Sequence, residues 1–248
     1  MKIQATSPWG NVTIDLSQAI DISIPVQRNG VKGFYIPDPQ IEAFTAGSFI
    51  GSVKAGSSCN VNDIKFNPHG NGTHTECIGH ITRDEVSLNV VLKDFFAWAR
   101  LITVDPTELS NGDFVIEARH FNMLTIEEGI NALVIRTTPN SIDKKTFDYS
   151  GKNPCYLMEE ATQWIVERGI KHLLIDLPSM DREDDGGKLL SHKAFWLFNT
   201  AQPRMNATIT EFIYVDNAVP DGNYLLNLQV SAFENDAAPS RPLLFSTI

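Results

Sequence analysis

The chain contains two short, uninterrupted apolar runs, NALVIRT at residues 131–137 and HLLIDLP at residues 172–178. Runs of this kind are typical of strands that are buried on both faces of a sheet. The sequence therefore predicts that these two strands lie inside the fold, with covering layers on both sides.

A helix is predicted between the two runs. It begins at Asn153 and Pro154, a capping residue followed by proline at the first helical position. Apolar residues then recur at three-to-four spacing from Leu157 to Ile165, and Gly169 ends the pattern. The segment predicts an amphipathic helix of about 15 residues, and with its neighbours it forms a strand–helix–strand unit.

Most of the remaining chain predicts strands. Short β-rich runs bounded by turn residues begin at Val12, Asp21, Gly33, Ser48 and Asp63. Near the end, the runs at 209–215, 224–233 and 241–245 predict at least two further strands. We expect a mixed α/β fold in a single domain over residues 1–248.

Composition excludes several classes of protein. The 248 residues are 42% apolar, which is enough for a full core without disulfides. The net charge of -10 and the lack of a basic cluster argue against nucleic-acid partners. No stretch reaches the roughly 18 apolar residues that a membrane span needs, and the start, MKIQATSPWG, lacks the apolar region of a signal peptide. With Cys59, Cys77 and Cys155 at unpatterned spacing, we expect a cytoplasmic protein.

Three of the six histidines, His69, His74 and His80, lie within twelve residues. Glycines and a proline in this segment oppose a helix, and in extended chain residues two apart point to the same side. His74 and Glu76 then reach one metal ion, with His69 as a third ligand and His80 beyond them on the same face. Imidazole and carboxylate suit zinc, manganese or iron. The alternative is a polar surface loop with solvated histidines, because no established zinc signature has this spacing.

The segment resembles the HxGTHxDxPxH motif of the putative cyclase family, which includes bacterial kynurenine formamidases and isatin hydrolases. The GTH core is intact as Gly72–Thr73–His74. The resemblance covers most of the chain in the family's order, through DLS at 15–17, the run at 131–137, IDLPSMD at 175–181, His192, Glu211 and APSRP at 238–242.

The resemblance implies a role for five residues. His74 corresponds to a metal-binding histidine, and Glu76 to a metal-bridging aspartate. His80 matches the motif's final histidine, a general acid/base beside the metal. His192 and Glu211 resemble the pair that completes a second metal site in the formamidases, and the chain between them is longer than is usual in the family.

The chain also departs from the motif. The first motif histidine falls at Gly70, one position after His69. Either a one-residue bulge brings His69 onto the metal, or that ligand is absent. The motif aspartate is Glu76, and the motif proline is missing near Ile78 and Gly79.

The family resemblance implies a swivelling β/β/α fold, usually a homodimer, and a metal-dependent hydrolase. A zinc or manganese ion is expected to activate water against a small amide, formamide, lactone or lactam. The alternative is a member with a degenerate metal site, which is either a ligand-binding protein or a cyclase or dehydratase.

Several other residues have a simpler structural interpretation. His120 and His172 match no family site, and Cys77 is interpreted as small buried filler. The acidic run at 181–185 is typical of a solvated loop, although Asp181 directly follows a predicted buried strand, where functional loops often lie.

Overall fold

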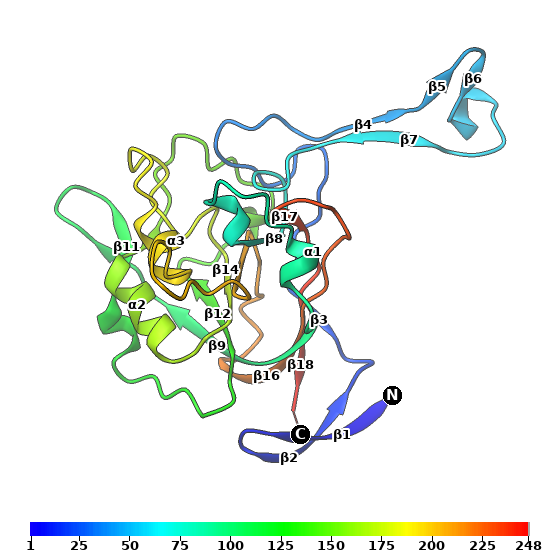
Figure 1. The fold of residues 1–248 in the computed structure, drawn as a ribbon. Coiled ribbons are helices and arrows are strands. Elements are labelled where there is room, and N and C mark those ends of the chain that lie inside the picture. Colours follow the sequence, from blue (N-terminus) through cyan, green and yellow to red (C-terminus); the bar gives the residue numbers. More distant parts are fainter. Residues whose placement is uncertain (248) are drawn as a thin grey trace.

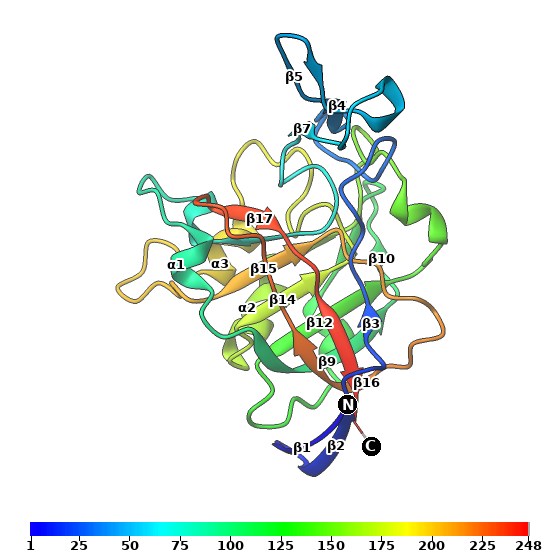
Figure 2. The same ribbon diagram turned by 90° about the vertical axis from the view of Figure 1, so that its right-hand side faces the viewer.

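The computed structural model describes residues 1–247, and its main element is a curled sheet of nine strands (Figures 1 and 2). In chain order the strands are β3 Ile20–Asp21, β8 His74–Cys77, β9 Phe96–Val104, β12 Ala132–Thr137, β14 His172–Ile175, β15 Thr208–Glu211, β16 Gly222–Asn227, β17 Ala237–Pro239 and β18 Leu243–Ser246. They lie side by side in the order β17-β8-β15-β14-β12-β9-β16-β18-β3. The four central strands, β15, β14, β12 and β9, are parallel, and the outer pairs are antiparallel.

Smaller elements surround this sheet. The short strands are β1 Lys2–Ser7, β2 Gly10–Asp15, β4 Gln40–Ala43, β5 Thr45–Ala46, β6 Phe49–Ile50, β7 Asn62–Lys65, β10 Thr107–Glu108, β11 Phe114–Ile116 and β13 Tyr156–Leu157. The α-helices are α1 Leu88–Val91, α2 Glu159–Glu167 and α3 Leu190–Phe195, and the 3-10 helices are η1 Val53–Ala55, η2 Ile78–His80, η3 Ala118–Phe121 and η4 Ile142–Lys145.

Both faces of the central sheet are buried. Leu133 and Ile135 of β12 belong to the core beneath α2 and α3, whereas Val134 belongs to a second core on the other face. Successive side chains of a strand point to opposite faces, so an uninterrupted apolar run fills both cores. The mixed α/β class and the two buried strands are therefore confirmed.

The helix after β12 differs from the prediction. Asn153 has a φ of +48°, which is outside the helical region, and Tyr156 and Leu157 form β13, which pairs with β11. Because Tyr156 and Leu157 pair with a distant strand, the first part of the predicted helix is not helical. Helix α2 begins only at Glu159, and Gly169, with a φ of +72°, follows its end as predicted.

One predicted strand is wrong, and several observed strands were not predicted. The run at Gly33 forms no strand, because Phe34 and Tyr35 adopt left-handed backbone angles, with φ of +56° and +57°. The longest strand, β9, was not predicted, yet it lies between β12 and β16 in the middle of the sheet.

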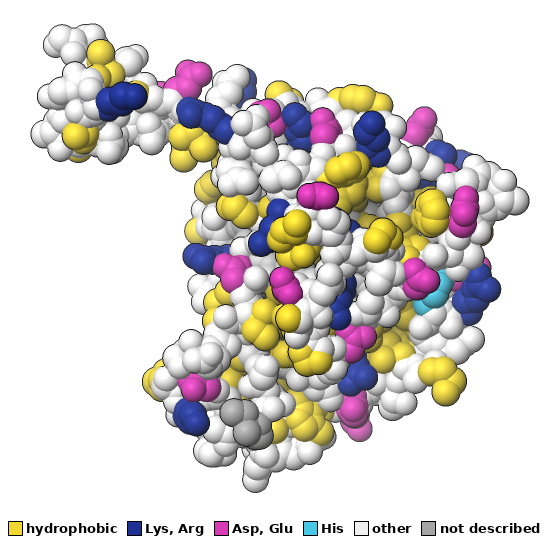
Figure 3. All heavy atoms as spheres, turned by 180° about the vertical axis from the view of Figure 1, so that it is seen from behind, with side chains coloured by type: hydrophobic (Ala, Val, Ile, Leu, Met, Phe, Trp, Pro, Cys, Tyr) yellow, Lys and Arg dark blue, Asp and Glu magenta, His cyan; other side chains and the backbone are white. Residues whose placement is uncertain are grey.

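A long hairpin projects from the body, and we call residues 40–65 the arm (Figure 1). Within residues 1–247, its strands pair only with each other, β4 with β7 and β5 with β6. Six of its apolar side chains are exposed: Phe44, Phe49, Ile50, Val53, Val61 and Ile64. Figure 3 shows the arm standing clear of the rest of the molecule, with hydrophobic side chains on its surface.

Among the described residues, 1–247, no helix combines the length and the apolar character that crossing a bilayer requires.

His172, in β14, predicts how stability depends on pH. Its ring is buried and its Nδ1 lies 2.8 Å from Thr208 Oγ1. Burial, with a smaller effect of Lys171, lowers the pKa of His172 from 6.5 to about 4. The unfolded chain therefore binds this proton at a higher pH than the folded chain, and the free energy of unfolding falls as the pH drops from about 6.5 to about 4.

At about 1.4 kcal/mol per pKa unit, His172 alone should lower the free energy of unfolding by on the order of 3 kcal/mol between pH 6.5 and pH 4. The variant H172N keeps a hydrogen-bonding group near Thr208 but does not titrate in this range. We expect urea unfolding of the metal-free proteins at pH 7 and pH 4 to show that H172N loses about that much less unfolding free energy than the wild type. Equal losses in both proteins would contradict the assignment.

Candidate metal centre

Strand β8 carries the central residues of the histidine-rich segment. His74 lies opposite Glu211 of β15, and Glu76 lies opposite Ala237 of β17. His74 and Glu76 are both buried, and their ligand atoms lie within 4.8 Å of each other and of a ring nitrogen of His69. His74 and Glu76, two residues apart on an extended strand, therefore face the same point, as the sequence predicts.

The turn into β8 is fixed by its glycine and threonine. Gly72 has a φ of +76°, and a Cβ there would lie 2.9 Å from the carbonyl oxygen of Ile24, so a larger residue is excluded by both strain and space. The Thr73 hydroxyl accepts a hydrogen bond from Ile24 N at 2.7 Å and donates one to Phe212 O at 2.5 Å. The Gly72–Thr73 pair thus holds His74 in place.

His69 reaches the same point from a turn. Asn67 closes this turn through backbone bonds from residues 70 and 71, and its side chain accepts a bond from the His69 N–H. His69 Nδ1 then lies 3.1 Å from Glu76 Oε2. A Cβ at Gly70 would lie 2.3 Å from the Ile36 side chain. The imidazole therefore comes from position 69, through a turn and not through a bulge in the strand.

Two further predicted residues, His192 and Glu211, lie beside Glu76 and His74. His192, on α3, places Nε2 3.1 Å from Glu76 Oε1, while its Nδ1 lies 2.5 Å from Asp181 Oδ2. Glu211 Oε1 accepts a hydrogen bond from Met180 N at 3.0 Å, and its Oε2 lies 3.3 Å from His74 Nε2. Both side chains thus have one atom anchored and one atom facing the cluster.

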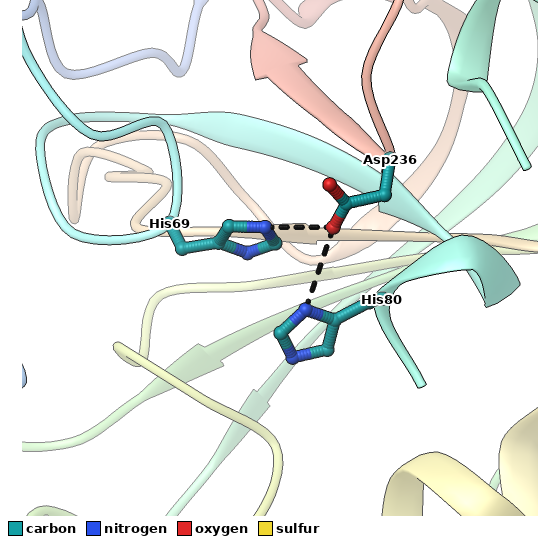
Figure 4. A group of neighbouring side chains, drawn as sticks. All are labelled: His69, His80 and Asp236. Atoms are coloured by element: carbon teal, nitrogen blue, oxygen red, sulfur yellow. Dashed lines mark hydrogen bonds and ion pairs between the residues drawn. The ribbon is translucent and has the colours of Figure 1, made fainter. Parts of the chain in front are cut away.

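His80 lies at the edge of this cluster and is partly exposed. Strand β8 ends at Cys77, so the 3-10 helix η2, not continued strand, carries His80. His80 Nδ1 lies 3.9 Å from Glu76 Oε2 and 3.5 Å from Asp236 Oδ2. Asp236 also lies 2.8 Å from His69 Nε2 (Figure 4).

The charges in the cluster support one another. Burial raises the pKa of the Glu76 carboxyl, but the charge of His80 and the close imidazoles of His192 and His69 outweigh it and hold that pKa well below its ordinary value. Burial lowers the pKa of His69, but Asp236 and Glu76 outweigh it and raise that pKa to about 10. Asp181 and Glu76 likewise raise the pKa of His192 to about 10 against the effect of burial.

The donor set fits a divalent cation. His74 Nε2 and Glu76 Oε2 are buried, and within residues 1–247 neither makes a hydrogen bond, although Glu211 Oε2 lies 3.3 Å from the first and His69 Nδ1 lies 3.1 Å from the second. An unpartnered buried polar atom is costly, and two of them facing one cluster indicate a position built for a ligand. His69, His74 and Glu76 form one group that could hold a metal ion, and Glu76 and His192 belong to another.

The remote nitrogens of two of these imidazoles already have acceptors. His74 Nδ1 lies 3.4 Å from the Gly72 carbonyl oxygen, and His192 Nδ1 lies against Asp181. An acceptor on one ring nitrogen fixes the tautomer and leaves the other nitrogen free for a metal. His74 and His192 are therefore oriented with Nε2 toward the cluster.

The cluster opens into a pocket of about 350 Å³. Phe34, Ile36 and Leu189 supply apolar walls, while His69, His80 and His192 lie on its lining. Phe34 and Leu189 both have left-handed backbone angles, with φ of +56° and +48°. A small molecule with an apolar part fits these walls.

Sequence reasoning missed Asp236 and left Asp181 without a function. The acidic run at 181–185 was interpreted as a solvated loop with Asp181 as the residue that could be functional, and Asp181 is buried and contacts His192. Its place directly after the run at 172–178 was the available signal. Asp236 has no such signal, because only the pairing of β17 with β8 brings it to the histidines.

Two remaining candidates, His120 and Cys77, have contacts outside the cluster. His120 Nε2 contacts Thr107 and its Nδ1 caps the 3-10 helix at Glu117. Cys77 is buried, and burial raises the pKa of its thiol to about 11. Both have the structural roles expected from the sequence.

Comparisons with known proteins give the same family. The model of the family described as "Putative cyclase" matches residues 14–182. The kynurenine formamidase of Bacillus cereus is 26% identical over 195 residues, which cover 78% of this chain and 83% of that protein.

Two solved structures share the fold. One, described as a predicted metal-dependent hydrolase from Bacillus stearothermophilus, has a TM-score of 0.64 and 19% identity, and the match covers 92% of this chain and 98% of that chain. The other is an isatin hydrolase bound to the product analogue thioisatinate, with a TM-score of 0.66, 16% identity and 93% of each chain covered. Together with the family match over residues 14–182, the preserved GTH turn on β8 shows that the chain belongs to the putative cyclase family.

Proposed function

We propose that the protein is a metal-dependent hydrolase of a small non-peptide amide, formamide, lactam or lactone. One observation carries the proposal: the imidazoles of His69, His74 and His192 and the carboxylates of Glu76 and Glu211 converge beside a pocket, and two buried atoms among them make no hydrogen bond. The names of similar proteins, kynurenine formamidase, metal-dependent hydrolase and isatin hydrolase, support hydrolysis.

The proposed ligands form two groups that share Glu76. His69, His74 and Glu76 would hold one ion. Glu76 and His192, whose Oε1 and Nε2 lie 3.1 Å apart, would hold a second together with Glu211, whose Oε1 lies 4.0 Å from His192 Nε2. Mixed nitrogen and oxygen donors suit zinc or manganese. A divalent ion bound there polarises a carbonyl and lowers the pKa of water from about 15.7 to about 7.

The chain's own groups supply positioning and proton transfer. The pocket size restricts the substrate to a small molecule, and the walls at Phe34, Ile36 and Leu189 favour an apolar substituent beside the scissile carbonyl. His80, partly exposed on the lining, accepts a proton as water adds to the carbonyl carbon. It returns that proton to the departing nitrogen or oxygen as the bond breaks, a role that contributes roughly 10²–10⁴ in rate.

The proposal predicts turnover that depends on the metal and on His74. Protein stripped of metal and reloaded separately with zinc or manganese should hydrolyse at least one class in a panel of formyl-anilines, isatin-like lactams and lactones. In H74A, the affinity for the ion held by His69, His74 and Glu76 should fall more than about 100-fold, beyond the 10–100-fold typical when only a partner of a ligand is lost, and kcat/KM should fall with it.

The matched control is H120Q, which removes a histidine outside the cluster and should retain metal and activity. The same number of bound ions and the same affinities in H74A as in the wild type would contradict the ligand role. A wild-type protein without metal and without turnover would instead support a ligand-binding protein, and activity without net consumption of water would support a cyclase or dehydratase.

Metal uptake should release protons. The pKa values of His69 and His192 are raised to about 10 without metal, so at pH 8 both rings are protonated, and each must lose a proton before it binds an ion. We expect about two protons released when both groups fill and a higher affinity as the pH rises toward 10. Titration calorimetry in buffers of different ionisation enthalpy counts these protons, and no release at pH 8 would contradict the charge assignment.

We also propose that the chain works as a homodimer that uses the arm. A two-stranded hairpin is marginally stable in water by itself, and exposed apolar patches mark interaction sites. In a twofold dimer, the arm of each copy would pack its apolar side chains against the body of the other copy. Both arms are then buried, and no surface is left to add a third copy.

The dimer is tested by one charge placed on the arm. Ile64 is 59% exposed, so I64K should cost the monomer little stability but should disrupt a dimer in light scattering coupled to size exclusion. M123K places the same charge on the body, where Met123 is 96% exposed, and should leave the dimer intact. A monomeric wild-type protein at micromolar concentration would refute this proposal.

A further inference from the structure

Asp236 is held rigidly beside the histidine cluster by its backbone. It directly precedes β17, and its carbonyl oxygen accepts a hydrogen bond from Cys77 N at 3.0 Å. The next residue, Ala237, pairs with Glu76 in the β17–β8 ladder. The position of the Asp236 carboxylate is therefore set by the same strand that carries His74 and Glu76.

A single oxygen of this carboxylate meets two imidazoles. Asp236 Oδ2 lies 2.8 Å from His69 Nε2 and 3.5 Å from His80 Nδ1 (Figure 4). Hydrogen bonds from both rings hold the pKa of Asp236 well below its ordinary value. The carboxylate thus pairs with His69 through a hydrogen bond and with His80 at ion-pair distance.

We propose that Asp236 is a positioning residue that orients the metal-binding His69 and the proton-transferring His80 together; this inference rests on the proposed function. An N–H donated by His69 Nε2 to Asp236 leaves Nδ1, 3.1 Å from Glu76 Oε2, with its lone pair toward the ion position. An N–H donated by His80 Nδ1 leaves Nε2 free, on the side of the ring away from Asp236 (Figure 4). One carboxylate fixes both tautomers.

The local packing is specialised for this contact. A Cβ at Gly79 would lie 3.1 Å from Asp236 Cβ and 2.2 Å from the Val86 carbonyl oxygen. Glycine at position 79 therefore lets the η2 turn approach closely enough for His80 to reach Asp236.

The same three side chains could also be a separate cation site, because their ligand atoms lie within 4.8 Å of one another. The geometry favours positioning. An ion between Asp236 and His69 Nε2 would require His69 to give up its second proton before Nδ1 could also bind an ion, since neutral imidazole offers one lone pair. The buried atoms without partners, His74 Nε2 and Glu76 Oε2, also belong to the other group.

The test compares D236A and D236N with E234Q. Glu234 lies in the same loop, bonds to Asn89 and is exposed, so E234Q removes the same charge without touching either imidazole. Three quantities are measured on each protein: the imidazole tautomers by ¹⁵N–¹H correlation in the zinc-loaded form, zinc affinity by competition with a chromophoric chelator, and kcat and KM on whichever substrate is turned over.

We expect D236A to bind zinc roughly 10–100-fold more weakly, to lose the single Nδ1–H tautomer of His80, and to lower kcat by about 10²-fold or more with little change in KM. D236N, whose amide oxygen still accepts a hydrogen bond, should recover part of each loss, and E234Q should match the wild type. The tautomers and the zinc affinity test the inference even if no substrate in the panel reacts.

Unchanged tautomers and zinc affinity in D236A would overturn the proposal. So would an additional ion in the wild type that D236A loses, because Asp236 would then be a ligand of a separate site.

Discussion

The buried carboxylate of Glu76 is the interaction on which the site depends. A charge removed from water costs several kcal/mol unless partners replace the solvent. His69, His192 and His80 approach Glu76 from a turn, a helix and a 3-10 turn, and each lies within 4 Å of its oxygens. The fold must keep these segments together, since an unpaired charge at this position would destabilise it.

The sheet explains how distant segments reach one carboxylate. Strand β8 lies between β15 and β17, so Glu211 on one neighbour and Asp236 at the start of the other flank the residues of the GTH turn. The parallel strand β14 leads directly into the loop of Asp181, which anchors His192. A small change in the register of β8 would exchange its inward and outward side chains and would remove the site.

Local patterns in the sequence predict the parts of this structure that depend on local chemistry. Strand patterns predict β12 and β14 and the shared side of His74 and Glu76, and the family resemblance beyond the motif indicates His192 and Glu211. The start of α2 was missed because pairing of Tyr156 with β11 is a long-range event. Long-range packing also shapes the turn that carries His69, because Ile36 fills the space beside Gly70. Asp236 reaches His69 and His80 only through the pairing of β17 with β8, which no local spacing in the sequence reveals.

The central claim is that the imidazoles and carboxylates around Glu76 form a metal centre. Diffraction from zinc-loaded crystals on either side of the zinc absorption edge tests it most directly. The account predicts an anomalous peak about 2.0–2.1 Å from His69 Nδ1 and His74 Nε2 and at a similar distance from a Glu76 oxygen. A fully loaded protein whose anomalous peaks all lie elsewhere, with these side chains still paired to one another, would contradict it.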